Sequence, residues 1–199
     1  MGLSNIWRQS IHMKLSILIP SVFERYEALQ KVTRALIQQI GDNKEVELLV
    51  LLENKRRPVG AKRNDLLTLS RGDYVVFVDD DDRVTDDYVS QLLLAIDTSK
   101  ADCIVFDVSV SLDGRRPKIA KYDHTYKHGE DRRHYYRKPN HLMCYRRSLA
   151  VAHKFQEIGF GEDDEWGARA SQEIKTQHRI EKVLYHYDYV TKPRTWYAQ

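Results

Sequence analysis

Over the first 110 residues, short apolar runs alternate with segments whose apolar residues recur at helical spacing, and this alternation limits the possible folds most. Strands are expected over 14–19, 46–52, 74–78 and 103–110. Between them, helices are expected over 27–40, 61–69 and 86–96. Strands that alternate with helices pair in parallel through right-handed crossovers. The sequence therefore predicts an α/β fold with a mostly parallel, doubly wound sheet flanked by helices.

The third apolar run ends in four consecutive carboxylates, Asp79 to Asp82. Like charges crowded at the end of a buried strand destabilise a fold unless a cation or a basic partner neutralises them. In an extended backbone Asp79 and Asp81 would point to one side and Asp80 to the other. Two carboxylates on one side suit Mg²⁺ or Mn²⁺ carrying a diphosphate. A solvated acidic turn, or the cap of the next helix, is the structural alternative.

Parallel sheets of this kind bind ligands beyond the carboxyl ends of their strands. Pro20, Glu53 and Asp79 stand at the expected ends of the first three strands, so we expect them to converge on one crevice. A second acidic cluster, residues 162–165, opens a helix expected to run through residue 172. The helix dipole alone favours acids in a first turn. An ionised carboxylate there can also act as a general base.

The net charge of +3 conceals a strongly basic segment. Residues 115–147 hold eleven Lys and Arg against three acids, a balance of +8 that leaves −5 for the rest of the chain. Histidines and tyrosines are interleaved with these cations. Such a segment can bind polyanions through phosphate contacts and stacking. It can equally be a solvated connection whose arginines pair with the acidic clusters, and both interpretations stay open here.

Length and composition are those of one globular domain. A chain of 199 residues can bury a real core. No apolar stretch approaches the roughly 20 residues that span a bilayer, and the N-terminal segment lacks the apolar run of a secretory signal. Cys103 and Cys144 lie in apolar contexts without metal-type spacing, so we expect buried, reduced thiols in a cytoplasmic protein. No obligate protein partner is evident.

Four motifs, in their order and spacing, resemble those of glycosyltransferase family 2. They are Leu15-Ser16-Ile17-Leu18-Ile19-Pro20-Ser21, Gly60-Ala61-Lys62-Arg63-Asn64, Gly72-Asp73-Tyr74-Val75-Val76-Phe77-Val78-Asp79-Asp80-Asp81-Asp82 and Glu162-Asp163. The resemblance is dense over 14–96 and, beyond residue 110, rests on Glu162-Asp163 and Trp166. It implies the nucleotide-diphospho-sugar transferase (GT-A) fold in a single domain, 1–199. Within that domain it implies a nucleotide-sugar-binding half over 14–110 and an acceptor-binding and catalytic-base half over 111–199.

The resemblance implies that the donor nucleotide lies at the ends of the first strands. Pro20 and Ser21 would line the base and ribose pocket, with Phe23 as a stacking face. Glu53 stands where the family usually has Asp contacting the base, so the acceptor oxygens are kept on a longer side chain. Arg63 would reach the base or the diphosphate, and a cation on the helix surface is its structural alternative.

The carboxylate run would complete the donor site and hold a metal ion. By the same resemblance, Asp79 and Asp80 would contact ribose or sugar, and Asp81 would ligate Mn²⁺ or Mg²⁺. Asp79 and Asp82 are further candidate ligands. So is His186, because some enzymes of this fold place a C-terminal His on the metal or diphosphate; a packed structural His is its alternative. The metal would offset charge developing on the departing nucleoside diphosphate.

Three more residues have two interpretations each. Trp166 is either a stacking face for the acceptor or a core aromatic. Lys192 and Arg194 either close over the diphosphate or are solvated charges near the C-terminus.

Residues and resemblance together predict a metal-dependent, inverting glycosyltransferase, more narrowly a hexosyltransferase. It would move a sugar from a UDP-type donor, expected to be UDP-glucose, to an acceptor hydroxyl. Asp163 is the first choice for the general base and Glu162 the second. The basic segment 115–147 favours DNA with hydroxymethylated bases as acceptor, in a phage-type DNA-base glycosyltransferase. A saccharide or lipid-linked acceptor is the alternative.

Two other classes of protein share some of these features. A nucleotidyltransferase usually carries a glycine-rich loop after its first strand, and residues 20–25 contain no glycine. A non-catalytic nucleic-acid-binding module would account for the basic segment but leave the two carboxylate clusters unexplained.

Overall fold

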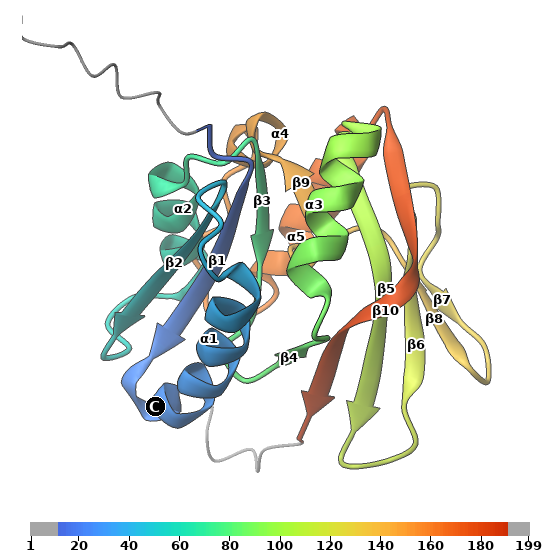
Figure 1. The fold of residues 1–199 in the computed structure, drawn as a ribbon. Helices are drawn as coiled ribbons and strands as arrows, with labels where there is room; N and C mark the ends of the chain where they lie inside the picture. Colours follow the sequence, from blue (N-terminus) through green and yellow to red (C-terminus); the bar gives the residue numbers. More distant parts are fainter. Residues whose placement is uncertain (1–11, 191–199) are drawn as a thin grey trace, which may run out of the picture.

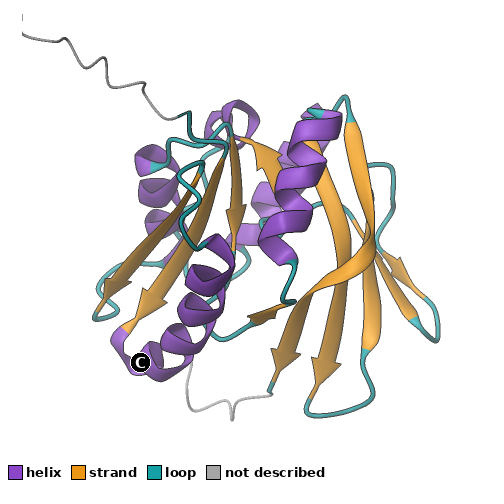
Figure 2. Ribbon diagram, viewed as in Figure 1, coloured by secondary structure: helices purple, strands orange, loops and turns teal. Residues whose placement is uncertain are grey.

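The structure is a computed structural model that describes residues 12–190; Lys192 and Arg194 lie outside them. A continuous, twisted sheet carries helices on both faces (Figures 1 and 2). The strands are β1 (Leu15–Val22), β2 (Val46–Glu53), β3 (Tyr74–Phe77), β4 (Arg83–Val84), β5 (Cys103–Leu112), β6 (Lys118–Tyr122), β7 (Gly129–Glu130), β8 (His134–Arg137), β9 (Cys144–Arg146) and β10 (Gln177–Tyr189). The α-helices are α1 (Tyr26–Ile40), α2 (Val59–Leu69), α3 (Tyr88–Ser99), α4 (Arg147–Ala152) and α5 (Glu162–Ala170). Two short 3-10 turns are η1 (Phe23–Arg25) and η2 (Ser171–Glu173).

Strand β1 is the centre of the parallel part of the sheet. It pairs in parallel with β2 on one side and β3 on the other. Its first seven residues are buried, as expected for a parallel strand covered on both faces. Gly72 allows the turn before β3 to pack closely against β1, since a Cβ there would lie 2.6 Å from the Ser16 nitrogen.

Helices α1 and α3 lie on one face of the sheet, and α2, α4 and α5 lie on the other (Figure 1). Helix α1 buries Leu29, Val32 and Leu36, whose spacing of three and four residues places them on one stripe facing the sheet. It ends at Gly41, whose φ of 53° is a conformation that glycine adopts at little cost.

The sheet has the order β2-β1-β3-β9-β5-β6-β8-β7. Strand β9 lies between β3 and β5 and is antiparallel to both, so β3 and β5 run in the same direction. Strand β10 runs parallel to β5, and its Tyr185–His186 portion pairs antiparallel with β4. This mostly parallel, mixed sheet with flanking helices confirms the predicted fold class.

The structure departs from the sequence-based boundaries at several points. Strand β1 continues to Val22, so Pro20 lies inside the strand and not at its end. Strands β6, β7 and β8 were not predicted, because they are short and polar. Only 182–184 of the long β10 was recognised as strand-like, since charged and polar residues surround that apolar triplet.

The core confirms two expectations about single residues. Cys103 and Cys144 are buried free thiols. Trp166 is 1% exposed and stacks on Phe155 at 4.8 Å, so it is a core aromatic and not an acceptor platform. No helix among residues 12–190 is long and apolar enough to cross a membrane.

Candidate active site

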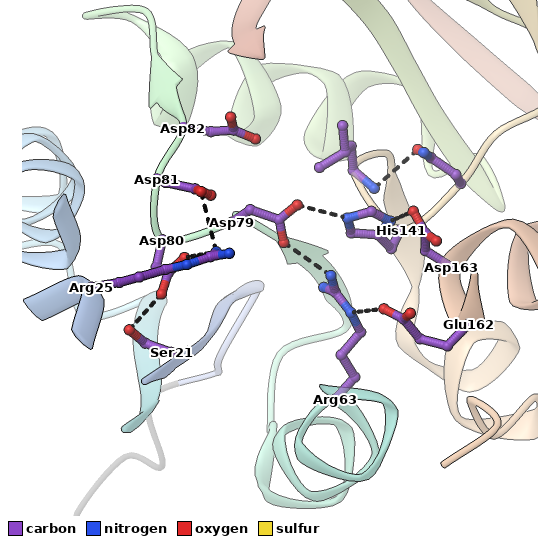
Figure 3. Close-up of polar contacts among 12 residues, drawn as sticks. Ser21, Arg25, Arg63, Asp79, Asp80, Asp81, Asp82, His141, Glu162 and Asp163 are labelled. Atoms are coloured by element: carbon purple, nitrogen blue, oxygen red, sulfur yellow. Dashed lines mark hydrogen bonds and ion pairs between the residues drawn. The ribbon is translucent and has the colours of Figure 1, made fainter. Parts of the chain in front are cut away.

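The four carboxylates after β3 lie on a turn. The Asp82 N–H donates to the Asp79 carbonyl oxygen at 3.3 Å, which bends the chain over Asp80 and Asp81. The expectation that Asp79 and Asp81 share one side required an extended backbone and does not hold. Figure 3 shows Asp79 directed away from the turn, toward α2 and α5, while Asp80 and Asp81 share a different cation.

That cation is Arg25, in the 3-10 turn after β1. Its Nη1 lies 2.8 Å from an Asp80 oxygen and 3.2 Å from an Asp81 oxygen. The Ser21 hydroxyl donates to the other Asp80 oxygen at 2.7 Å. Ser21 and Asp80 are therefore buried partners that fix the end of β1 against the carboxylate turn. The Asp81 side chain remains 47% exposed and is available to a ligand.

Arg63, on α2, joins the two acidic clusters. Its Nη2 donates to Asp79 at 2.9 Å and its Nε to Glu162 at 3.2 Å (Figure 3). The guanidinium lies over the ring of Phe77, 5.1 Å from the ring centroid, and its side chain is 5% exposed. Arg63 is therefore a buried cation bonded to both acidic clusters. The structure does not place it on the surface, where the alternative interpretation had it.

His141 makes the second link between the clusters. Its Nε2 lies 3.3 Å from Asp79 and its Nδ1 lies 3.4 Å from Asp163, with the ring 4% exposed. The ring also packs edge-on against Phe77. Figure 3 shows the imidazole between the two carboxylates. His141 thus lies between Asp79 and Asp163, and its Nδ1 makes no hydrogen bond within residues 12–190.

The two candidate bases differ in accessibility. Glu162 is buried and is held by Arg63, whereas the Asp163 side chain is 31% exposed and is contacted by His141. Both lie in the first turn of α5, which begins after Gly161 in a left-handed conformation with φ of 81°. Of the two, only Asp163 has a carboxylate open to a substrate.

The pKa values of the carboxylates of the turn are shifted in different directions. Burial alone would raise the pKa of Asp79, but Arg63 and His141 outweigh it and hold that pKa well below its usual range. Burial raises the pKa of Asp82 to about 8, and the neighbouring charge of Asp79 adds to the effect. Burial also raises the pKa of Asp81, and the Arg25 charge offsets part of this rise. Negative charge at Asp81 and Asp82 is therefore incompletely neutralised by the protein.

Tyr185, on β10, faces this turn. Its hydroxyl donates to Asp82 at 2.7 Å and accepts the Asp79 N–H at 3.0 Å. Adjacent strand residues point to opposite faces, so His186 points away from the carboxylates. Burial is the main effect on the His186 pKa and lowers it. The charges that also act on this pKa are those of Arg83 and Asp188, not those of the carboxylate turn. The structure thus does not bring His186 together with the carboxylates of the turn.

Among the described residues, no group of three or more His, Cys, Asp or Glu side chains is arranged to hold a metal ion. Any cation here would take only one or two protein ligands. Mg²⁺ commonly binds in this way, with water and substrate phosphates completing its octahedron. Asp81 and Asp82 fit such a role, because their oxygens are hard ligands and their charge is not fully compensated.

The remaining donor-site candidates lie at the ends of β1 and β2. Glu53 ends β2 and accepts hydrogen bonds from the Arg57 N–H at 3.2 Å and Nε at 3.4 Å. Burial would raise its pKa, but these bonds outweigh that effect and lower it. Phe23 is 57% exposed, in the position expected of a stacking face, whereas Pro20 is buried. Lys62 is also buried here and donates to the Ser21 carbonyl at 3.0 Å.

Some cations of the basic segment 115–147 are bonded to groups of the protein itself. Arg146 pairs with Asp102, Arg147 bonds to Ser70, and Lys118 pairs with Glu130. These three side chains therefore stabilise contacts within the protein. Other cations of the segment have no acid within ion-pair distance among residues 12–190: Arg115, Arg116, Lys121, Lys127, Arg132, Arg133 and Lys138.

Sequence reasoning missed Arg25, His141 and Tyr185 as parts of this site. Arg25 carried a weak signal, because it follows the first strand closely. His141 lay among several histidines of the basic segment and nothing distinguished it. Tyr185 belongs to an alternating Tyr185, Tyr187, Tyr189 pattern that could have marked one strand face turned toward a site.

Comparisons with known proteins concern the family and the fold of the chain. A model of the family described as glycosyl transferase family 2 matches residues 33–155. A crystal structure of S. aureus TarS superposes with a TM-score of 0.67 and 16% identity, over 89% of this chain and 37% of that one. TarS 1-349 in complex with UDP gives a TM-score of 0.64 and 16% identity, over 93% and 62%. TarS 1-349 in complex with UDP-GlcNAc gives a TM-score of 0.62 and 15% identity, over 94% of this chain and 62% of that one.

At these identities the similarity to TarS establishes the fold and not the substrate. The chain spans less than two thirds of the length of each of these structures. No curated protein matches the sequence.

Proposed function

The chain belongs to glycosyl transferase family 2, and we propose that it transfers a sugar from a UDP-type donor to an acceptor hydroxyl with inversion and with the help of a divalent metal. Membership makes the chain a glycosyltransferase, which sets aside the nucleotidyltransferase and the non-catalytic binding module. The UDP and UDP-GlcNAc complexes of TarS support a UDP-sugar as donor. UDP-glucose remains the donor we expect, and UDP-GlcNAc is the alternative that the TarS complex suggests.

One observation carries the proposal: Arg63 and His141 bind both acidic clusters together. The carboxylate turn that would receive the diphosphate is thereby held close to the helix that presents Asp163. A transferase needs this arrangement, because the leaving group and the base act on opposite sides of the same sugar carbon. The clusters lie far apart in the sequence, so only the fold joins them.

Asp163 is the proposed general base. Its carboxylate would accept the proton of the acceptor hydroxyl as the oxygen attacks the sugar. The His141 ring lies against that carboxylate. Arg63 binds Glu162, which is therefore a positioning group and not a second base. A single displacement with one base and no protein nucleophile inverts the configuration of the sugar carbon.

Asp81 and Asp82 are the residues that would hold a divalent metal. When bound, the metal would supply positive charge opposite the leaving diphosphate. Arg25 binds both Asp80 and Asp81 and thereby fixes the turn in position. Ser21, Phe23 and Glu53 would line the nucleoside pocket beside it.

We assign donor binding to 14–110 and acceptor binding to 111–199. The unpaired cations of the basic segment support an anionic acceptor, and DNA with hydroxymethylated bases is the one we propose. A saccharide acceptor is the second candidate. Phe160 favours it, because this aromatic ring is 85% exposed just before α5 and could stack on a sugar face.

The test is release of UDP from a panel of UDP-sugars, with and without Mn²⁺ or Mg²⁺. We expect metal-dependent release that rises when the correct acceptor is added. Asp81→Asn should lose metal-dependent UDP binding without loss of folding, since it keeps the side-chain shape and removes the charge. Equal UDP affinity in the Asp81→Asn and unmodified proteins, with metal present, would contradict the proposed metal site.

A further inference from the structure

A cavity of about 120 Å³ lies beside the proposed base, and the proposed function leaves it unassigned. Its lining residues are Tyr122, His128, Arg137, Lys138, Pro139, Asn140, Asp164, Gly167 and Ala168. A single water molecule needs roughly 10–15 Å³ by this measure. The cavity therefore has room for a group of several heavy atoms.

Chain connectivity places this cavity next to Asp163. Asn140 and Asp164 line the cavity, and they immediately adjoin His141 and Asp163, which are 3.4 Å apart. Helix α5 packs tightly against this segment, since a Cβ on Gly167 would lie 3.0 Å from the Pro139 carbonyl oxygen. A molecule in the cavity would therefore sit against the helix that carries the base.

One cation of the cavity wall has no acidic partner in the part of the chain that the structure describes. The Lys138 ammonium has no acid within ion-pair distance among the described residues, although its side chain is only partly exposed. Arg137 is anchored by donating to the Gly129 and Tyr136 carbonyl oxygens at 2.8 and 2.9 Å. Burial raises the Tyr122 pKa, and the Arg137, Asp163 and Asp164 charges also act on it, so this phenol stays neutral near all three. Asp164 is the single acid of the lining.

We propose that this cavity is an acceptor subsite that holds a phosphate group, with Lys138 and Arg137 as its cations and Tyr122 as a neutral donor. A lysine and an anchored arginine are the side chains that proteins use to bind phosphate oxygens. The assignment rests on the proposed function, because the phosphate would belong to the sugar acceptor. Phosphate binding itself can nevertheless be measured without any transfer.

The experiment uses the full chain with UDP and Mg²⁺ at saturation, so that the donor site is filled. Inorganic phosphate is titrated while the backbone amide signals of Lys138, Asn140 and Gly167 are followed by NMR. We expect saturable shifts at these amides. Lys138→Gln should weaken phosphate binding about tenfold, since it removes a charge-assisted hydrogen bond. Lys44→Gln, the same change at an exposed lysine outside the basic segment, should leave binding unchanged.

A second pair of variants tests the cavity directly. Ala168 is exposed on α5 and lines the cavity. Ala168→Glu places a negative charge in it and should abolish phosphate binding, whereas Ala168→Gln has the same size and should retain most of it. Retained UDP affinity in both variants shows that the fold is intact. Absence of saturable shifts, or equal binding by the two variants, would overturn the subsite.

The same titration separates the inference from the proposed function. If phosphate binding depends on Lys138 but the protein transfers no sugar, the phosphate site is confirmed and the proposed transferase function is contradicted. A single-stranded oligodeoxynucleotide that displaces the phosphate would identify a nucleic-acid phosphodiester as its source. Failure of the oligonucleotide to displace it would assign the subsite to a phosphate on a smaller acceptor.

Discussion

At the scale of single residues, the site depends on which carboxylates are neutralised and which are not. Asp79 and Glu162 are bound by Arg63, and Asp80 is bound by Arg25 and Ser21. Asp163 retains an open carboxylate and Asp82 a raised pKa. The residues whose charge is satisfied build the site, and the others are left to act on substrate or metal.

Replacing Asp163 by Asn tests the base. Asn keeps the contact surface for His141 but cannot accept a proton, so transfer should fall by about 10²–10⁴-fold. UDP binding should remain, because the carboxylate turn is untouched. Steady-state rates and UDP affinity measured on the same preparation check this. A mutant that transfers sugar at the unmodified rate would assign the base to Glu162 or to the acceptor.

The raised pKa of Asp82 predicts how stability changes with pH. Its ordinary value is 3.8 and its folded value is about 8, so between these limits the folded protein binds more protons than the unfolded chain. Stability without divalent metal should therefore fall as the pH rises from about 4 toward about 8. Asp82→Asn has no such titration and should show a flatter profile.

Urea unfolding at pH 5 and pH 8 measures this difference. The unmodified protein should lose more stability between the two values than Asp82→Asn does. Added Mg²⁺ should reduce that loss if the ion binds at the turn. Profiles that run in parallel for the two proteins would rule out Asp82 as the titrating group.

At the scale of elements, the placement of α5 depends on a close contact with α2. A Cβ on Gly60 would lie 1.9 Å from the Gln156 carbonyl oxygen, in the segment that leads to α5. The Gly60 N–H also donates to the Ile158 carbonyl at 3.4 Å. Helix α2 carries Arg63 and α5 carries Asp163, so this contact sets the distance between the two halves of the site.

Gly60→Ala should therefore destabilise the fold by about 1–3 kcal/mol, the usual range for an overpacked site. It should also lower transfer more than UDP binding, since it displaces the segment before α5. Gly159→Ala is the matched control, because nothing lies within 4 Å of a Cβ there. Thermal melting and transfer rates of both variants check the prediction, and equal melting temperatures would contradict it.

The strands and helices could be predicted where they are buried, because a buried element has a recognisable pattern of apolar residues in the sequence. The parallel strands β1 and β3 are almost wholly buried and β2 is partly buried, and all three have continuous apolar runs that are easily recognised. Strands β6 to β8 are partly exposed, short and polar, and no period distinguished them from loops. The acidic clusters were visible, but the side chains that join them were not, because His141 reaches Asp79 and Asp163 only through the fold.

At the scale of the whole molecule, the open question is how the basic segment is used. Arg146, Arg147 and Lys118 are bonded to other groups of the protein. The charge available to a partner is therefore smaller than the balance of +8 counted from the sequence. Arg132 and Arg133, between β7 and β8, are exposed and have no acidic partner within the described residues. They are two of the exposed cations that a long polyanion would reach outside the cavity.

If DNA is the acceptor, affinity for single strands should fall as salt rises, with a slope of roughly −0.7 for each phosphate neutralised. Arg132→Gln with Arg133→Gln should reduce both the affinity and the slope, while UDP affinity stays unchanged. Lys31→Gln with Arg34→Gln removes equal charge from exposed positions of α1 and should change neither. Fluorescence anisotropy over a salt series measures all three proteins. If the slope is the same in all three, the segment does not follow a phosphate backbone. Absence of DNA binding even at low salt would leave the saccharide acceptor, for which the exposed Phe160 is the recognition element to test next.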